Sequence, residues 1–143
     1  MECFSVPWAQ ENLLVIQEHH TTGIAPAVPP LTTPPWLTAV RAAESKKAQD
    51  VVVLDLREVT SFADFFVICT GSNPKQIQAI AEEIGAQLEE RGEHPHSVEG
   101  FANAEWILAD YGDYLVHIFS AKSRTFYELE RLWRHAKVVP IPA

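Results

Sequence analysis

Gly71 and Ser72 come closest to a known catalytic arrangement. They stand between an apolar run and a segment of helical periodicity. A Gly-Ser turn between a strand and a helix can hold a phosphate group, and enzymes that transfer nucleotides add two carboxylates that bind metal ions. These carboxylates must stand two positions apart on a strand, so that both point to one side. The first acids after the turn are Glu82 and Glu83, neighbours on a predicted helix that point about 100° apart. We therefore interpret the turn as a capped helix start, and we predict no catalytic residue and no cofactor.

Histidine and cysteine add little further chemistry. His94 and His96 offer two nitrogens to a metal ion, but no Cys or third His stands near them, so no metal site is predicted. His117 lies in an apolar run, where a hydrogen-bonded structural histidine is more common than a ligand or a base. Cys3 and Cys69 are far apart, and this fits free thiols in a reducing cytoplasm better than a disulfide framework.

The segment between Trp106 and Tyr114 carries groups that suit protein binding. Strand alternation places Trp106, Leu108 and Asp110 on one face and Ile107, Ala109 and Tyr111 on the other. Both faces hold large apolar groups, so a face that helices leave bare needs another cover. Loops or the N-terminal residues can provide it, but Trp and Leu rimmed by acids favour a partner protein.

Seven elements are expected to position these residues. Helices are predicted at 36–49, 74–91 and 123–136, and strands at 51–56, 65–70, 105–111 and 114–119. Asn73 and Pro74 suit a helix start, and Gly112 with Asp113 predicts a hairpin turn. The last helix is expected to bury Phe126, Leu129, Leu132 and Trp133. This order predicts a single α/β domain with a small mixed sheet, on which helices pack mainly on one face.

Length and composition set the domain boundaries. The chain has 143 residues, of which 47% are hydrophobic and 21% are charged, and this balance indicates one globular domain. We expect a Pro-rich, weakly ordered arm at 1–35, the domain at 36–137 and a short tail at 138–143. The arm holds an apolar run at 13–16 that could dock on a surface the sequence does not identify. With no basic N-terminal patch and no long apolar run, we expect neither a targeting peptide nor a membrane span.

The net charge of −8 bears on the kind of partner. Binding to bare RNA depends on Lys and Arg that neutralise phosphates, so direct, sequence-specific nucleic-acid binding is not expected. An acidic surface can instead be steered to a basic protein. The charge is equally consistent with a role in solubility alone.

Several stretches together resemble the ribosomal silencing factor family, also called the Iojap or RsfS family. They are DVVVLDL at 50–56, ADFFVICTGS at 63–72, QAIAEE at 78–83, VEG at 98–100, EWILADYGD at 105–113, VHIF at 116–119 and RTFYELERLW at 124–133. They follow the order and spacing of the family over the region 36–136. The C-terminal LWRHA pattern most resembles cyanobacterial members, and the Pro-rich arm departs from the compact family domain.

The resemblance implies a nucleotidyltransferase-like fold without the transferase chemistry. It also implies binding to the large ribosomal subunit through ribosomal protein fourteen, on the face that meets the small subunit. Occupying that face blocks subunit joining and represses translation when nutrients are short. Family members can self-associate, and organelle relatives assist ribosome biogenesis.

The resemblance also suggests the residues that contact the partner. They are Trp106, Asp110 and Tyr111 in the hairpin, and Tyr127, Glu128 and Glu130 in the last helix. Strand alternation adds Leu108, which shares a face with Trp106 and Asp110. Two other functions remain open from the residues alone: a metal-dependent nucleotidyltransferase-like enzyme, and a homodimeric scaffold without a ribosomal role.

Overall fold

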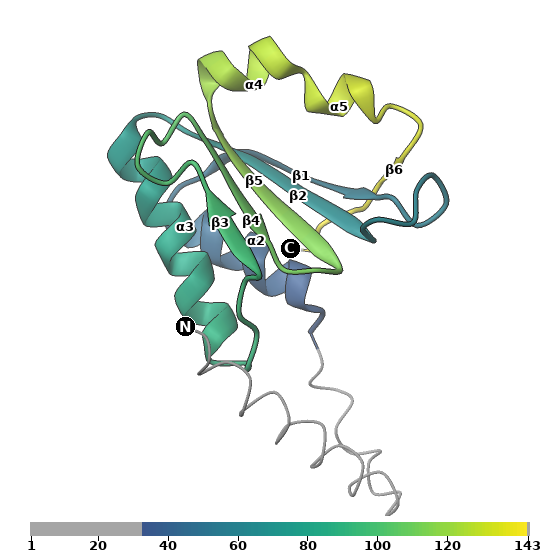
Figure 1. Cartoon of the computed structure of the whole chain (residues 1–143), viewed down its shortest axis with the longest axis horizontal. Coiled ribbons are helices and arrows are strands. Elements are labelled where there is room, and N and C mark those ends of the chain that lie inside the picture. Colours follow the sequence, from purple (N-terminus) through teal and green to yellow (C-terminus); the bar gives the residue numbers. More distant parts are fainter. Residues whose placement is uncertain (1–32, 143) are drawn as a thin grey trace, which may run out of the picture.

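The computed structural model describes residues 33–142, and a mixed sheet forms the centre of this part of the chain (Figure 1). The strand order is β3-β4-β5-β2-β1-β6. The elements are α2 (Pro35–Ser45), β1 (Gln49–Asp55), β2 (Phe65–Gly71), α3 (Pro74–Glu89), β3 (Ser97–Glu99), β4 (Trp106–Asp110), β5 (Tyr114–Ser120), α4 (Ala121–Tyr127), α5 (Leu129–Leu132) and β6 (Lys137–Val138). The prediction of an α/β domain with a small mixed sheet is confirmed.

The sheet is mixed because β2 and β5 run parallel while the other neighbouring strands are antiparallel. Helix α3 and strands β3 and β4 connect β2 to β5. The β4–β5 hairpin turns at Gly112, whose φ of 94° is a conformation that favours glycine, as the hairpin signal predicts. Strands β3 and β6 were not predicted, because two or three residues are too few to show a periodicity.

Helices α2 and α3 cover one face of the sheet. The apolar stripe of α3, with Ile77, Ile80, Ile84 and Leu88, is fully buried there. It packs with Val67, Cys69, Val116 and Ile118 from the central strands in the larger of two core clusters. Burial of these apolar side chains on this face stabilises the fold.

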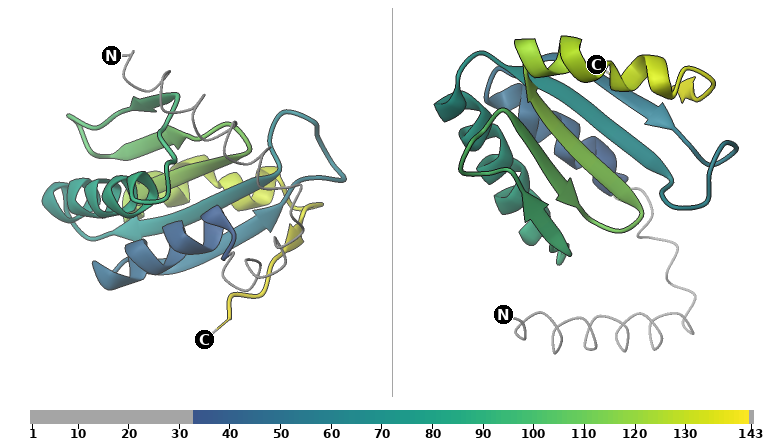
Figure 2. Two further views of the ribbon diagram at one scale, coloured as in Figure 1. Left: turned by 90° about the horizontal axis from the view of Figure 1, so that it is seen from below. Right: turned by 45° about the horizontal axis from the view of Figure 1, so that its top comes forward.

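Helices α4 and α5 lie over the other face, so the helices are not mainly on one side as predicted (Figure 2). Leu129 and Trp133 pack there against Leu54, Phe66, Ile68 and Phe119. The predicted helix at 123–136 is broken at Glu128, where φ is 43°. The break turns Phe126 and Leu132 outward, to exposures of 76% and 69%, so the prediction that they are buried is wrong.

Residues beyond 137 continue along the edge of the sheet. Val138 is opposite Leu54, and the Val139 N–H donates to the Val53 carbonyl over 2.8 Å. Val139 and Ile141 pack against the larger core cluster. Of the arm predicted at 1–35, residues 1–32 lie outside the described part of the chain.

Candidate docking site

The Gly71–Ser72 turn is a capped helix start, as the sequence predicts. Asn73 Oδ1 accepts from the Gln76 N–H at 2.8 Å, and the Ser72 N–H and hydroxyl both donate to Gln76 Oε1, at 2.6 and 2.7 Å. A Cβ on Gly71 would stand 2.6 Å from Ile77 Cγ1, so glycine is needed here for the strand to approach the helix. The Ser72 donors and the Gln76 N–H are therefore already used within the turn.

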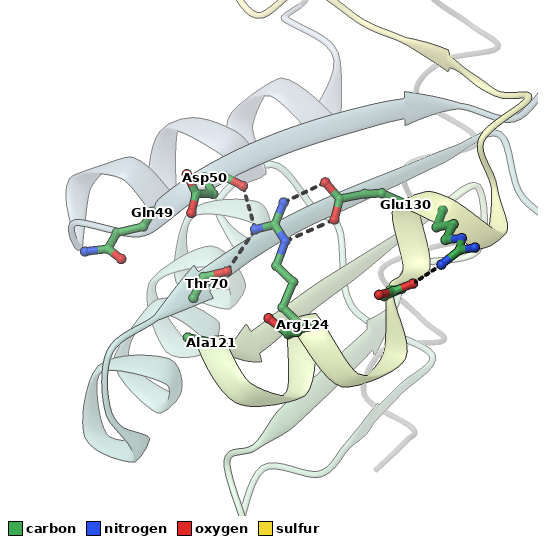
Figure 3. A pocket seen from close by; sticks show the side chains of 9 residues that line it. Gln49, Asp50, Thr70, Ala121, Arg124 and Glu130 are labelled. Carbon is green, nitrogen blue, oxygen red and sulfur yellow. Dashed lines mark hydrogen bonds and ion pairs between the residues drawn. The ribbon is translucent and has the colours of Figure 1, made fainter.

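A hollow of ≈ 600 Å³ lies where the parallel strands β2 and β5 end, a common ligand position in α/β sheets. Its centre is filled by Arg124, as Figure 3 shows. The Arg124 Nε and Nη2 donate to the two carboxylate oxygens of Glu130 at 3.1 and 2.9 Å. Its Nη1 donates to Thr70 Oγ1 at 2.8 Å and to the Asp50 carbonyl at 2.7 Å. The guanidinium thus fastens α4 and α5 to the ends of β1 and β2 and is not free for an anion.

The two acids expected in the last helix differ in their surroundings. Glu130 is held by Arg124 beside the hollow, whereas Glu128 pairs with Arg131 at 3.1 Å on the open surface. Both carboxylates are therefore paired within the chain. Glu128 and Arg131 are both well exposed, so Glu128 can leave Arg131 and pair with a cation of a partner at small cost, whereas Glu130 cannot leave Arg124 as easily.

Trp106 and Tyr127 are brought together, although 20 residues separate them in sequence. Their ring centroids lie 4.6 Å apart, and Trp106 also stacks on Phe119 at 5.1 Å. Trp106 is half-buried, whereas Tyr127 is 47% exposed. Tyr127 of helix α4 thus packs over Trp106. Tyr127 and Phe126, with ring centroids 4.9 Å apart, form an outer aromatic surface on this side of the sheet.

His117 is buried beneath this aromatic surface. The Trp106 Nε1–H donates to His117 Nδ1 at 3.2 Å, so a neutral ring carries its proton on Nε2. Nε2 has no partner among the described residues, and burial lowers the pKa of His117 to about 4. The prediction of a hydrogen-bonded structural histidine is confirmed.

The remaining hairpin residues divide between the two faces. Leu108 and Asp110 are half-buried on the Trp106 face, and Asp110 Oδ1 accepts from the Gly112 N–H at 2.8 Å. Tyr111 is on the opposite face, stacked on Tyr114 with centroids 5.1 Å apart and only 7% exposed. Burial raises the pKa of Tyr111 to about 12. Its ring belongs to the core, which corrects the expectation that it lies at a docking surface.

Three residues that matter here were missed from the sequence: Arg124, Phe126 as an exposed side chain, and Phe62. Phe62 is 54% exposed and lies 5.8 Å from Trp133, centroid to centroid. Helical periodicity gave the wrong exposure for Phe126 because it assumes an unbroken helix. The Arg124–Glu130 pair, six positions apart, also exists only because the helix breaks between them.

Two further observations concern the described part of the chain. Residues 33–142 contain no cluster of three or more His, Cys, Asp or Glu side chains placed to hold a metal ion. Within the same range, no helix has the length and apolar character needed to cross a membrane.

The fold and this surface define a small single-domain α/β protein that presents exposed aromatic side chains on a helix over its sheet. Comparison with known protein families identifies the family within this class. The family model described as "Ribosomal silencing factor during starvation" matches residues 32–143, so the chain belongs to the ribosomal silencing factor family. The resemblance seen in the sequence is thereby confirmed.

Individual relatives agree. The Ribosomal silencing factor RsfS of Bacillus subtilis is 42% identical over 103 residues, covering 72% of this chain and 87% of that protein. The chloroplastic Protein Iojap of Zea mays is 33% identical over 106 residues, and the match spans 74% of this chain but only 46% of the plant protein.

Solved structures of similar proteins share the fold. A crystal structure from Bacillus halodurans matches with a TM-score of 0.65 and 41% identity, covering 72% of this chain and 93% of that one. A structure from Chromobacterium violaceum matches with a TM-score of 0.69 and 29% identity, covering 76% and 90%.

Proposed function

We propose that this protein binds the large ribosomal subunit in the cytoplasm through ribosomal protein fourteen and blocks joining of the small subunit. The proposal rests on membership of a family named for ribosome silencing. The observation that carries it is the outer aromatic surface of Phe126 and Tyr127, stacked on Trp106.

Exposed aromatic rings beside half-buried ones are suited to binding a protein. Phe126 is 76% and Tyr127 47% exposed, so both still have apolar area to bury. Large aromatic anchors carry much of the binding energy at protein interfaces. The net charge of −8 favours a basic partner, and charge attraction mainly speeds encounter.

The proposed mechanism is steric occlusion. A domain of this size, bound on the face where the two subunits meet, excludes the small subunit without any chemical step. Fewer joined ribosomes then means less translation. The four hydrogen bonds of Arg124 join α4 to α5 and to the ends of β1 and β2, which supports a fixed position of the aromatic surface on the domain.

The enzyme alternative finds less support in the geometry. The Ser72 donors are used by Gln76, and the acids at the neighbouring hollow are not two positions apart on one strand. Turnover of ATP with magnesium, abolished by Ser72→Ala, would favour the enzyme instead. The homodimeric scaffold is tested by the sedimentation experiment below.

The deciding experiment is sedimentation of the purified protein with separated ribosomal subunits. We expect co-migration with the large subunit alone, and less joining when the small subunit is added afterwards. Tyr127→Ala should weaken binding by about 10-fold or more. Thr125→Ala, an exposed change on the same helix, should leave binding within about two-fold. Absence of co-migration, or equal binding by both variants, would overturn the proposal.

A further inference from the structure

A second apolar surface lies at the far end of the helix pair, around α5. Val59, Leu132, Trp133, His135 and Ala136 line a groove of ≈ 410 Å³, which we call the α5 groove. Leu132 is 69% and Val59 40% exposed. An open groove with so much apolar lining is typical of a site that another segment covers.

Cationic side chains stand next to the α5 groove in the sequence, and two of them are paired with acids, Arg131 with Glu128 and Lys137 with Glu58. Residues 131–137 contain Arg131, Arg134 and Lys137 and no acid, in a chain whose net charge is −8. Lys137 is only loosely paired, with its Nζ 3.6 Å from Glu58 and both side chains more than 70% exposed. An apolar segment flanked by acids therefore suits the apolar lining of this groove and the cations beside it.

We propose that residues 11–18 of this same chain, Glu-Asn-Leu-Leu-Val-Ile-Gln-Glu, dock in the α5 groove. Neighbouring side chains point in different directions, so only those of 13–16 that share one side of the segment, Leu14 among them, would fill the groove. Glu11 and Glu18 would flank them. Residues 1–32 contain three glutamates and no lysine or arginine, so the charge is complementary over the whole segment.

The first described residues lie near the end of the sheet where the groove is found. Trp36, at the start of α2, lies 5.6 Å from Phe65, centroid to centroid. Phe65 is three residues after Phe62, whose ring lies 5.8 Å from Trp133 in the groove. Figure 1 shows the loop between β1 and β2 and helix α5 at the same end of the sheet. The start of the domain and the groove therefore lie at one end of the sheet but over its opposite faces, so the segment would have to pass around the sheet to reach the groove.

The intervening chain is long enough. Residues 17–34 can span up to about 60 Å when extended. A domain of this size has a radius of gyration of about 13 Å. A tethered segment is present at an effective concentration in the millimolar range, so even weak affinity for the groove would populate the contact.

The experiment uses the full chain with a spin label next to the proposed docking segment. Cys3→Ser with Gln10→Cys places one reactive thiol, because Cys69 is fully buried and does not take the label. We expect the methyl resonances of Leu132 and Val59 to lose more than half of their intensity. The methyls of Val98 are an internal control, since Val98 is exposed on β3 at the opposite edge of the sheet.

Two arm variants test the segment itself. Leu14→Asp should restore the Leu132 and Val59 intensities, whereas Val28→Asp, a matched change outside the segment, should not. Full intensity at both methyls in the labelled parent protein would overturn the proposal, as would unchanged broadening in Leu14→Asp.

A mixed sample identifies the source of the segment. Spin-labelled protein that is invisible in the spectrum is mixed with unlabelled, methyl-visible protein. We expect no broadening in this mixture. Broadening equal to that within one chain would mean that a second copy fills the groove, which contradicts the proposal.

Discussion

The Trp106 indole N–H donates to Nδ1 of the buried His117 across 3.2 Å, and this bond joins the surface aromatic cluster to the centre of the sheet. It fixes the neutral tautomer of the histidine and the orientation of the indole. Because Tyr127 packs on the same indole, the position of α4 depends on a residue that is itself only 4% exposed.

The first prediction concerns pH. Burial lowers the pKa of His117 from 6.5 to about 4, so below pH 6.5 the unfolded chain binds a proton that the folded chain rejects. Stability is therefore full above pH 6.5 and falls as the pH drops toward 4, by about 3 kcal/mol in all. Urea unfolding at several pH values should show this decline, and His117→Asn should remove most of it. Equal pH dependence in the two proteins would contradict the assignment.

The second prediction concerns the Arg124 clamp. Arg124→Ala leaves Glu130 without its partner and removes the bonds to Thr70 and Asp50, so we expect a loss of about 2–4 kcal/mol. Arg124→Lys should recover little of this, since an ammonium cannot bind two carboxylate oxygens in parallel and reach the strand ends as well. Arg131→Ala is the control, because its exposed pair with Glu128 contributes little. Urea unfolding gives the ranking, and similar losses at positions 124 and 131 would count against the clamp.

Sequence patterns predicted the elements where local signals were strong. Asn73 and Pro74 placed the start of α3, and Gly112 placed the hairpin. Strand alternation also put Trp106 and Tyr111 on opposite faces, as observed. Such signals depend on a few neighbouring residues, so a sequence contains them in full.

The candidate site was predicted less well because it depends on contacts between distant residues. The break at Glu128 is accompanied by a bond from Arg124 to residues of two strands, and no periodicity reports such a bond. Alternation separated the faces of β4 but could not say which helices would cover each. Tyr111 was therefore expected at a surface although α2 and α3 bury its face.

The third prediction compares the effect of a methyl group on stability at Gly71, just before α3, and at Gly85, within α3. Gly71→Ala puts a methyl group 2.6 Å from Ile77 Cγ1 and should destabilise the fold by about 1–3 kcal/mol. Gly85→Ala, in the middle of α3, meets nothing within 4 Å and should stabilise it by up to about 1 kcal/mol. Thermal unfolding of the two variants should therefore shift in opposite directions. A shift of the same sign in both would show that the strand–helix approach at Gly71 is not tight.

The fourth prediction separates folding from docking at the aromatic surface. Trp106→Ala removes rings packed on Phe119 and leaves both nitrogens of His117 without a partner, so we expect a loss of about 3–5 kcal/mol. Tyr127→Ala removes a half-exposed ring and should cost at most about 1 kcal/mol, because little buried area is lost. If the proposed function is correct, Tyr127→Ala nevertheless loses affinity for the large subunit while its circular dichroism spectrum and unfolding midpoint stay near those of the parent. Weak binding by Trp106→Ala is informative only where its spectrum shows a folded protein. A Tyr127→Ala protein that unfolds as easily as Trp106→Ala would show that Tyr127 supports the fold rather than the contact.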